Sequence, residues 1–196
     1  QLFDAADLQA NPREAKAGGV TTDIIESIRS TPETFPFKTK GVLIGASSYE
    51  ALQRSRYQLQ FENPKIEGIL DGGHNMLAIG THIVANAAGD EKLLRKVKTW
   101  PQMKDAWEGY RKEIEALRKQ PEGEDGTLDF LVPVEILVPS DLDSDESVEE
   151  FNRSLLDICA ARNNNVELKL ETKANQKGYY EAFRQPLPKH ISDNVE

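Results

Sequence analysis

The stretch from Gly68 to Ile79 constrains the fold more than any other part of this chain. It reads Gly-Ile-Leu-Asp-Gly-Gly-His-Asn-Met-Leu-Ala-Ile, so an apolar run ends in an aspartate, two glycines and a histidine before an apolar helical pattern begins. This order predicts a strand, a tight turn and a helix N-terminus. Adjacent glycines allow positive φ and a close approach of the backbone to a ligand. The first helical turn, at the positive end of the helix dipole, attracts anions.

Hydrophobic periodicity along the rest of the chain predicts an α+β fold with a mixed sheet and packed helices. We expect the strand over 66–70 to lie inside the sheet, with the 72–88 helix packed on it. Pro133 indicates an edge or a bulge in its strand. The other predicted strands cover 40–45, 56–61, 128–138 and 166–170, and the other predicted helices run from a Thr21 or Thr22 cap to before Pro32, from Trp100 to Leu117, and from an acidic cap at 140–145 to Asn163.

Composition excludes several classes of protein. Acidic residues outnumber lysine and arginine 33 to 24, which gives a net charge of −9 and disfavours general binding to nucleic acid. A single cysteine, Cys159, excludes an internal disulfide framework, fits a reducing cytoplasm and is expected in the core. No apolar run is long enough for a membrane span, so we expect a cytoplasmic location. The chain opens without methionine, and we expect it to be a fragment of a longer protein.

The residues from Asp71 to Ile79 resemble a bacterial family with an Asp-Gly-Gln-His-Arg motif before an apolar helix. That family includes regulators of DNA phosphorothioation systems. Asp71, Gly72, His74 and Ala78 match the pattern, whereas Gly73 stands where glutamine is usual. Asn75 stands where arginine is usual, so any role that the family gives this arginine is in doubt here.

Over more of its length the chain resembles the AIPR family of abortive-infection phage-resistance proteins. In that family a glycine-containing strand precedes an Ile-Val-Asn-Gly-like turn and an Ala-Ile helix, here residues 41–44 and 69–79. A later helix ends in an asparagine-rich stretch that leads into a strand, here 158–166. The order and spacing agree from about Asp23 to Phe183. The resemblance implies an anti-phage domain over 21–183, between an irregular N-terminal arm at 1–20 and a C-terminal tail at 184–196.

The segment from Gly72 to Ala78 also resembles, more loosely, the ParB/sulfiredoxin fold. In that fold a glycine and arginines at the start of a helix hold nucleotide phosphates. His74 and Asn75 occupy the places of the arginines in this chain. Phosphate binding would therefore use backbone amides, His74 and arginines from elsewhere, for which the candidates are Arg54, Arg56 and Arg162.

The candidate site centres on Asp71 and His74, with Gly72, Gly73 and Asn75 as ligand-binding residues. Asp71 could position Mg²⁺ or accept a proton from an attacking water, or it could serve only as a helix N-cap. His74 could donate to a phosphate oxygen or act as an acid–base group, or it could simply bond to a neighbouring carbonyl. A zinc pair with His82 is disfavoured, because eight helical residues place the two rings about 80° apart.

Asn163, Asn164 and Asn165 form an outer set of candidates. Their amides could bind a ligand edge, although asparagines after a helix commonly form its C-terminal cap and turn. Lys169, Lys173 and Lys177 could form a phosphate or nucleic-acid strip with Tyr179 and Tyr180, which follow them, or a solvated edge.

Two functional hypotheses follow. The first is a nucleotide-handling domain in which Asp71 and His74 support hydrolysis of a nucleoside triphosphate with Mg²⁺. The second is a non-catalytic recognition or regulatory module for DNA or a partner protein of the defence system, with the same turn as a static anchor. The chain has no Walker lysine and no catalytic triad recognisable by spacing, so turnover does not follow from the sequence.

Overall fold

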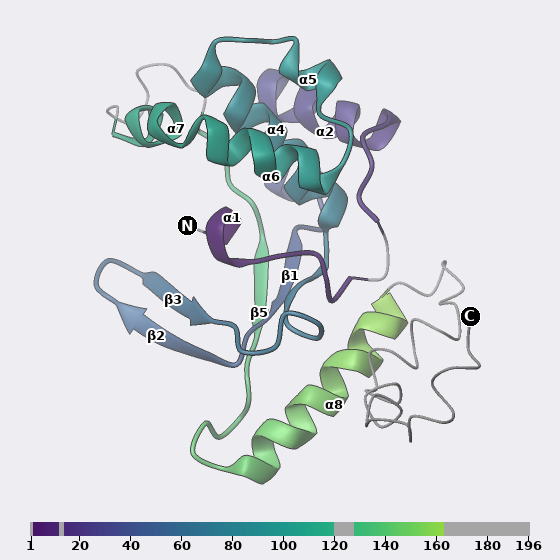
Figure 1. The fold of residues 1–196 in the computed structure, drawn as a ribbon, viewed down its shortest axis with the longest axis vertical. Helices are drawn as coiled ribbons and strands as arrows, with labels where there is room; N and C mark the ends of the chain where they lie inside the picture. Colours follow the sequence, from purple (N-terminus) through teal and green to yellow (C-terminus); the bar gives the residue numbers. More distant parts are fainter. Residues whose placement is uncertain (1, 12–13, 120–127, 163–196) are drawn as a thin grey trace, which may run out of the picture.

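A computed structural model of the chain describes residues 2–11, 14–119 and 128–162. These residues form an α+β fold with a mixed three-stranded sheet, helices packed against it and a separate two-stranded hairpin (Figure 1). The predicted strand over 166–170 lies outside the described residues. Among the helices of the described part, none has both the length and the apolar character that a membrane span needs.

The element bounds are as follows. The strands are β1 (Val42–Gly45), β2 (Ser48–Leu52), β3 (Arg56–Gln60), β4 (Gly68–Asp71) and β5 (Val134–Leu137). The helices are α1 (Leu2–Ala5), α2 (Gly19–Ser30), α3 (Phe35–Lys38), α4 (Gly73–Ala88), α5 (Leu93–Lys96), α6 (Trp100–Gly109), α7 (Arg111–Arg118) and α8 (Asp145–Arg162).

The described sheet has the order β4-β1-β5, with β4 antiparallel and β5 parallel to the central strand β1. Among the described residues β4 lies at an edge of the sheet, so the prediction that the strand over 66–70 lies inside the sheet is wrong for this part of the chain. The sequence of β4 resembles that of an interior strand because the N-terminal segment covers the edge of β4 that faces away from β1. The Ile69 N–H donates to the Asp7 carbonyl at 2.9 Å. Of the two positions that Pro133 indicates, β5 takes the edge within the described part of the sheet.

The cover over β4 comes from the N-terminal segment, which the sequence analysis treats as an irregular arm. The segment instead packs into the body of the molecule, with Phe3, Ala6, Leu8 and Ala10 buried. The Phe3 ring stacks on Trp107 with 4.4 Å between centroids. This packing explains how the apolar residues Ile69 and Leu70 can lie on an edge strand.

The strand–turn–helix prediction is confirmed. Helix α4 follows β4 directly, ends before Gly89 and is buried over most of its length. It packs against α2, α6 and α7, so apolar side chains are accommodated on several of its faces. At Gly80 a Cβ would lie 2.6 Å from the sulfur of Met103, which shows how closely α6 approaches.

Two other predictions need correction, and one strand was not predicted. The helix expected from Trp100 to Leu117 is split at Tyr110, whose φ of −110° and ψ of 23° separate α6 from α7. The strand expected over 128–138 is limited to the four residues of β5, because Pro133 lacks the N–H that would extend the ladder. The strand over 56–61 is β3, and its exposed partner β2 was not predicted.

We predict that Gly72→Ala destabilises the fold by about 2 kcal/mol or more. Gly72 has φ of +87°, and a Cβ there would lie 2.5 Å from the Gly41 carbonyl oxygen. Gly89→Ala is the matched control, because Gly89 also has positive φ but has no neighbour within 4 Å of an added Cβ. Gly89→Ala should lower the free energy of unfolding by about 1 kcal/mol. Urea unfolding of both variants measures the difference, and equal losses would show that the contact with Gly41 is unimportant.

Glu67 provides a pH-dependent test of the loop that joins the hairpin to β4. Burial raises the pKa of this carboxyl above 4.5, against the opposing effect of the Glu62 N–H, which donates to it at 2.6 Å. A raised carboxyl pKa means that the folded state binds a proton more tightly than the unfolded state. The free energy of unfolding should therefore fall as the pH rises from 4.5 through the folded-state pKa.

Replacing Glu67 by glutamine removes this titration and keeps an oxygen that can accept the Glu62 N–H. Relative to Glu67→Gln, the parent protein should lose stability as the pH rises from about 4 to about 8. Urea unfolding at several pH values measures this loss, with Glu115→Gln on α7 as the exposed control. Parallel pH profiles for the parent and Glu67→Gln would contradict the assignment.

Candidate functional site

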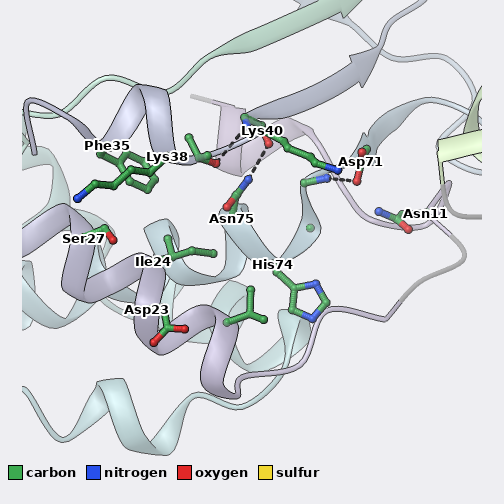
Figure 2. Close-up of a pocket in the computed structure, with 15 residues that line it drawn as sticks. Asn11, Asp23, Ile24, Ser27, Phe35, Lys38, Lys40, Asp71, His74 and Asn75 are labelled. Atoms are coloured by element: carbon green, nitrogen blue, oxygen red, sulfur yellow. Dashed lines mark hydrogen bonds between the residues drawn. The ribbon is translucent and has the colours of Figure 1, made fainter. Parts of the chain in front are cut away.

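A cavity of about 450 Å³ opens at the N-terminus of α4 (Figure 2). Its walls come from α2, from α3 with the segment that leads into β1, and from the turn between β4 and α4. All five residues of the predicted site line this cavity, so the structure places them together. The lining residues are Asn11, Val20, Asp23, Ile24, Ser27, Phe35, Lys38, Thr39, Lys40, Gly41, Asp71, Gly72, Gly73, His74 and Asn75.

The turn itself is built on Gly72, the N-cap residue of α4, which adopts the left-handed conformation. Positive φ was predicted for Gly72 or Gly73 and is confirmed at Gly72. The first intrahelical hydrogen bond runs from the Met76 N–H to the Gly72 carbonyl at 2.9 Å. The backbone amides of the first turn precede this bond and have no acceptor within the helix.

Asp71 lies one residue before the cap. Its Oδ1 accepts the Gly72 N–H at 2.7 Å, and α4 has no side-chain cap. The simple N-cap interpretation of Asp71 is therefore wrong, because a capping aspartate would accept from an amide two or three residues further on. The carboxylate still places negative charge near the positive end of the helix dipole, where it is stabilised.

Asn75 ties α4 to the start of β1. Its Nδ2 donates to the Gly41 carbonyl at 2.7 Å (Figure 2). A ligand that recruited this amide would first have to break a contact between two parts of the fold. The structure thus gives Asn75 a structural bond in addition to its place in the cavity wall.

His74 and Asp71 both line the cavity, but their side chains diverge from the start of α4 (Figure 2). Direct proton transfer between them is not supported by this arrangement. His82 is buried at 4% exposure and meets the Phe130 ring edge-on, so it belongs to the core rather than to a metal pair with His74. Within the described ranges no cluster of three or more histidine, cysteine or acidic side chains could hold a metal ion.

The cations of the cavity are lysines that the sequence analysis missed. The Lys40 side chain extends toward Asp71, whereas Lys38 points away from it (Figure 2). The Lys38 Nζ donates to Thr31 Oγ1 at 2.7 Å. No local sequence signal marked Lys40, because its place beside the turn depends on the antiparallel pairing of β1 with β4, which sets Leu43 opposite Asp71.

The arginines proposed for phosphate binding lie elsewhere. Arg54 and Arg56 belong to the hairpin, and Arg162 at the end of α8 pairs with Glu135 at 2.9 Å. None of the three lines the cavity. The expectation that they assist the Asp71 turn is therefore wrong, since spacing along the chain does not reveal which distant segment packs beside the turn.

The remaining candidates divide into one buried residue and one set outside the described part. Cys159 is confirmed as a core residue, and its Sγ donates to the Ala10 carbonyl at 3.2 Å. Asn163, Asn164 and Asn165 lie outside the described residues, as does the lysine series from Lys169 to Lys177.

The cavity combines two carboxylates, Asp23 and Asp71, with two lysines and the open turn of α4. Mg²⁺ commonly binds through one or two carboxylates together with substrate phosphates and water. Asp71 fits such a role, because a carboxylate that accepts one N–H retains further acceptor capacity.

Comparison with protein families, curated proteins and solved structures found no match for this chain.

We predict that Asn75→Ala lowers the free energy of unfolding by about 1–2 kcal/mol, since it leaves the Gly41 carbonyl without this donor. Asn75→Asp should lower the free energy of unfolding further, because it places a carboxylate against that carbonyl oxygen and the two acceptors repel each other. Urea unfolding measures both losses. Asn86→Ala removes an amide that bonds one turn back, to the carbonyl and the ring of His82, and controls for a local bond within the same helix. A stabilising effect of Asn75→Asp would show that favourable charge at the helix start outweighs the bond.

Proposed function

We propose that this chain is a domain of a bacterial anti-phage defence protein of the AIPR type. We further propose that the cavity at the start of α4 binds a nucleotide or another phosphate-bearing ligand. The defence role rests on the resemblance of residues 23–183 to that family. The binding role rests on one observation above the others: Lys40, the left-handed Gly72 and the first turn of α4 line a single cavity.

The arrangement of β4, the glycine turn and α4 supports the likeness to the ParB/sulfiredoxin core. In the proposed complex, a phosphate lies at the first turn of α4, where the backbone N–H groups have no acceptor within the helix. Lys40 supplies the cation that the absent arginines would supply in that fold. Mg²⁺ held by Asp71 would reduce the repulsion between this carboxylate and the phosphate.

Nucleotide hydrolysis is the enzymatic form of this proposal. Asp71 is the better candidate to accept a proton from water, since its carboxylate lies on the Lys40 side of the turn (Figure 2). His74 diverges from Asp71 and would instead contact a different part of the ligand. Such turnover would act as a switch for the larger defence protein.

A non-catalytic recognition or regulatory module is the second candidate function. One observation favours it: Asp71 and Asn75 both hydrogen-bond to backbone groups, as static anchors would. The module would then recognise DNA or a partner protein, and the turn would only shape its surface.

We predict that a nucleoside triphosphate with Mg²⁺ raises the melting temperature of the full chain by about 2–4 °C at saturating concentration. Lys40→Ala should abolish the shift, and His74→Ala should reduce it. Lys112→Ala on α7 is the control, because this lysine is exposed and does not line the cavity. Calorimetric or fluorescence melting curves measure the shift. Absence of a shift with any of the nucleotides would contradict the nucleotide proposal and favour the recognition module.

The role in defence has its own test. Cells that carry the full-length protein with Asp71→Ala and His74→Ala should lose protection against phage, measured as plating efficiency beside the parent protein. The paired control is Lys112→Ala, and immunoblots must show equal protein levels. Full protection by the double variant would show that this turn has only a structural role.

A further inference from the structure

The two sides of the cavity differ in chemical character. On one side, α2 contributes the apolar side chains of Val20 and Ile24, one turn apart, together with the polar side chains of Asp23 and Ser27. On the other side are Lys40 and the turn that begins at Asp71. Figure 2 shows Ile24 pointing from α2 into the cavity. A ligand that fills this space therefore contacts an apolar surface and a polar, charged surface at the same time.

Val20 is the most informative residue of the apolar side. It is 61% exposed at the start of α2, whereas Ile28 two turns further along the same helix is only 3% exposed. Packing of the described core thus does not account for the apolar side chain at position 20. Val20 lines the cavity instead.

The size of the cavity agrees with a ligand larger than a phosphate ion. Small-molecule sites usually occupy about 300–1,000 Å³ and combine apolar walls with a few placed polar groups. The cavity of about 450 Å³ lies in this range. An inorganic phosphate or pyrophosphate would use only the Lys40 side and would leave the surface of α2 uncovered.

We propose that the ligand is a nucleoside phosphate whose base lies against Val20 and Ile24 and whose phosphates lie at Lys40 and the Gly72 turn. This assignment rests on the proposed function and narrows it to one class of ligand. Val20 and Ile24 act as specificity determinants, since they distinguish a nucleotide from a phosphate chain without a base. Lys40 contributes to the binding of both kinds of ligand.

The test compares a nucleoside triphosphate with inorganic triphosphate, each with Mg²⁺, by isothermal titration calorimetry on the full chain. The parent protein should bind the nucleotide at least tenfold more tightly, because only the nucleotide covers the apolar side. Val20→Ser should weaken nucleotide binding about fivefold and leave triphosphate binding unchanged. Lys40→Ala should weaken both ligands.

Val20→Ser is suited to this test because the residue is exposed and serine is tolerated in the first turn of a helix. Leu131→Ser is the control for loss of an exposed apolar side chain, since Leu131 is 75% exposed and does not line the cavity. Equal affinity for the two ligands, or a nucleotide affinity that Val20→Ser leaves unchanged, would overturn the assignment of the base to α2. Failure of both ligands to bind would instead overturn the proposed function.

Discussion

The close approach of Gly72 to the backbone of Gly41 is the contact on which the rest of the site depends. A Cβ at Gly72 would lie 2.5 Å from the Gly41 carbonyl oxygen, and a Cβ at Gly41 would lie 2.1 Å from the Pro133 carbonyl oxygen. Two glycines in left-handed conformations therefore let the end of β4, the start of β1 and the entry to β5 meet at one point. Asn75 fixes α4 to the same point through the Gly41 carbonyl.

This junction also determines which side chains surround the cavity. Lys40 directly precedes Gly41, so the pairing of β1 with β4 brings a cation to the start of α4. Helix α2 packs against α4 and brings Val20 and Ile24 to the opposite side. The polar and apolar walls thus arise from two separate interactions, the pairing of β1 with β4 and the packing of α2 on α4. A change at the junction is expected to alter folding and ligand contacts together, which is why variants at Lys40 and Val20 separate the two effects better than variants at Gly72.

The features that sequence predicted well are local ones. The apolar strand, the glycine turn and helix α4 follow one another without a break, and each has its own periodicity or turn residues. The missed features depend on distant segments: the cover that residues 6–10 provide over β4, and Lys40 at the cavity. The split at Tyr110 was missed because the buried stripe of Met103, Trp107, Ile114 and Leu117 continues across it. Strand β2 was missed because its exposed residues carry little apolar signal and depend on pairing with β3.

Asp71 is compatible with both proposed functions, and the reason is electrostatic. Its carboxylate lies at the positive end of α4, in the place that an anionic ligand would also occupy. The bond from the Gly72 N–H uses Oδ1, and a carboxylate has acceptor sites on both oxygens. Asp71 can therefore keep this bond and still coordinate Mg²⁺, which would turn a repulsive contact with phosphate into an attractive one. A structural anchor and a ligand-binding residue are thus compatible at this position, and under the proposed function the charge of Asp71 would make nucleotide binding depend on Mg²⁺.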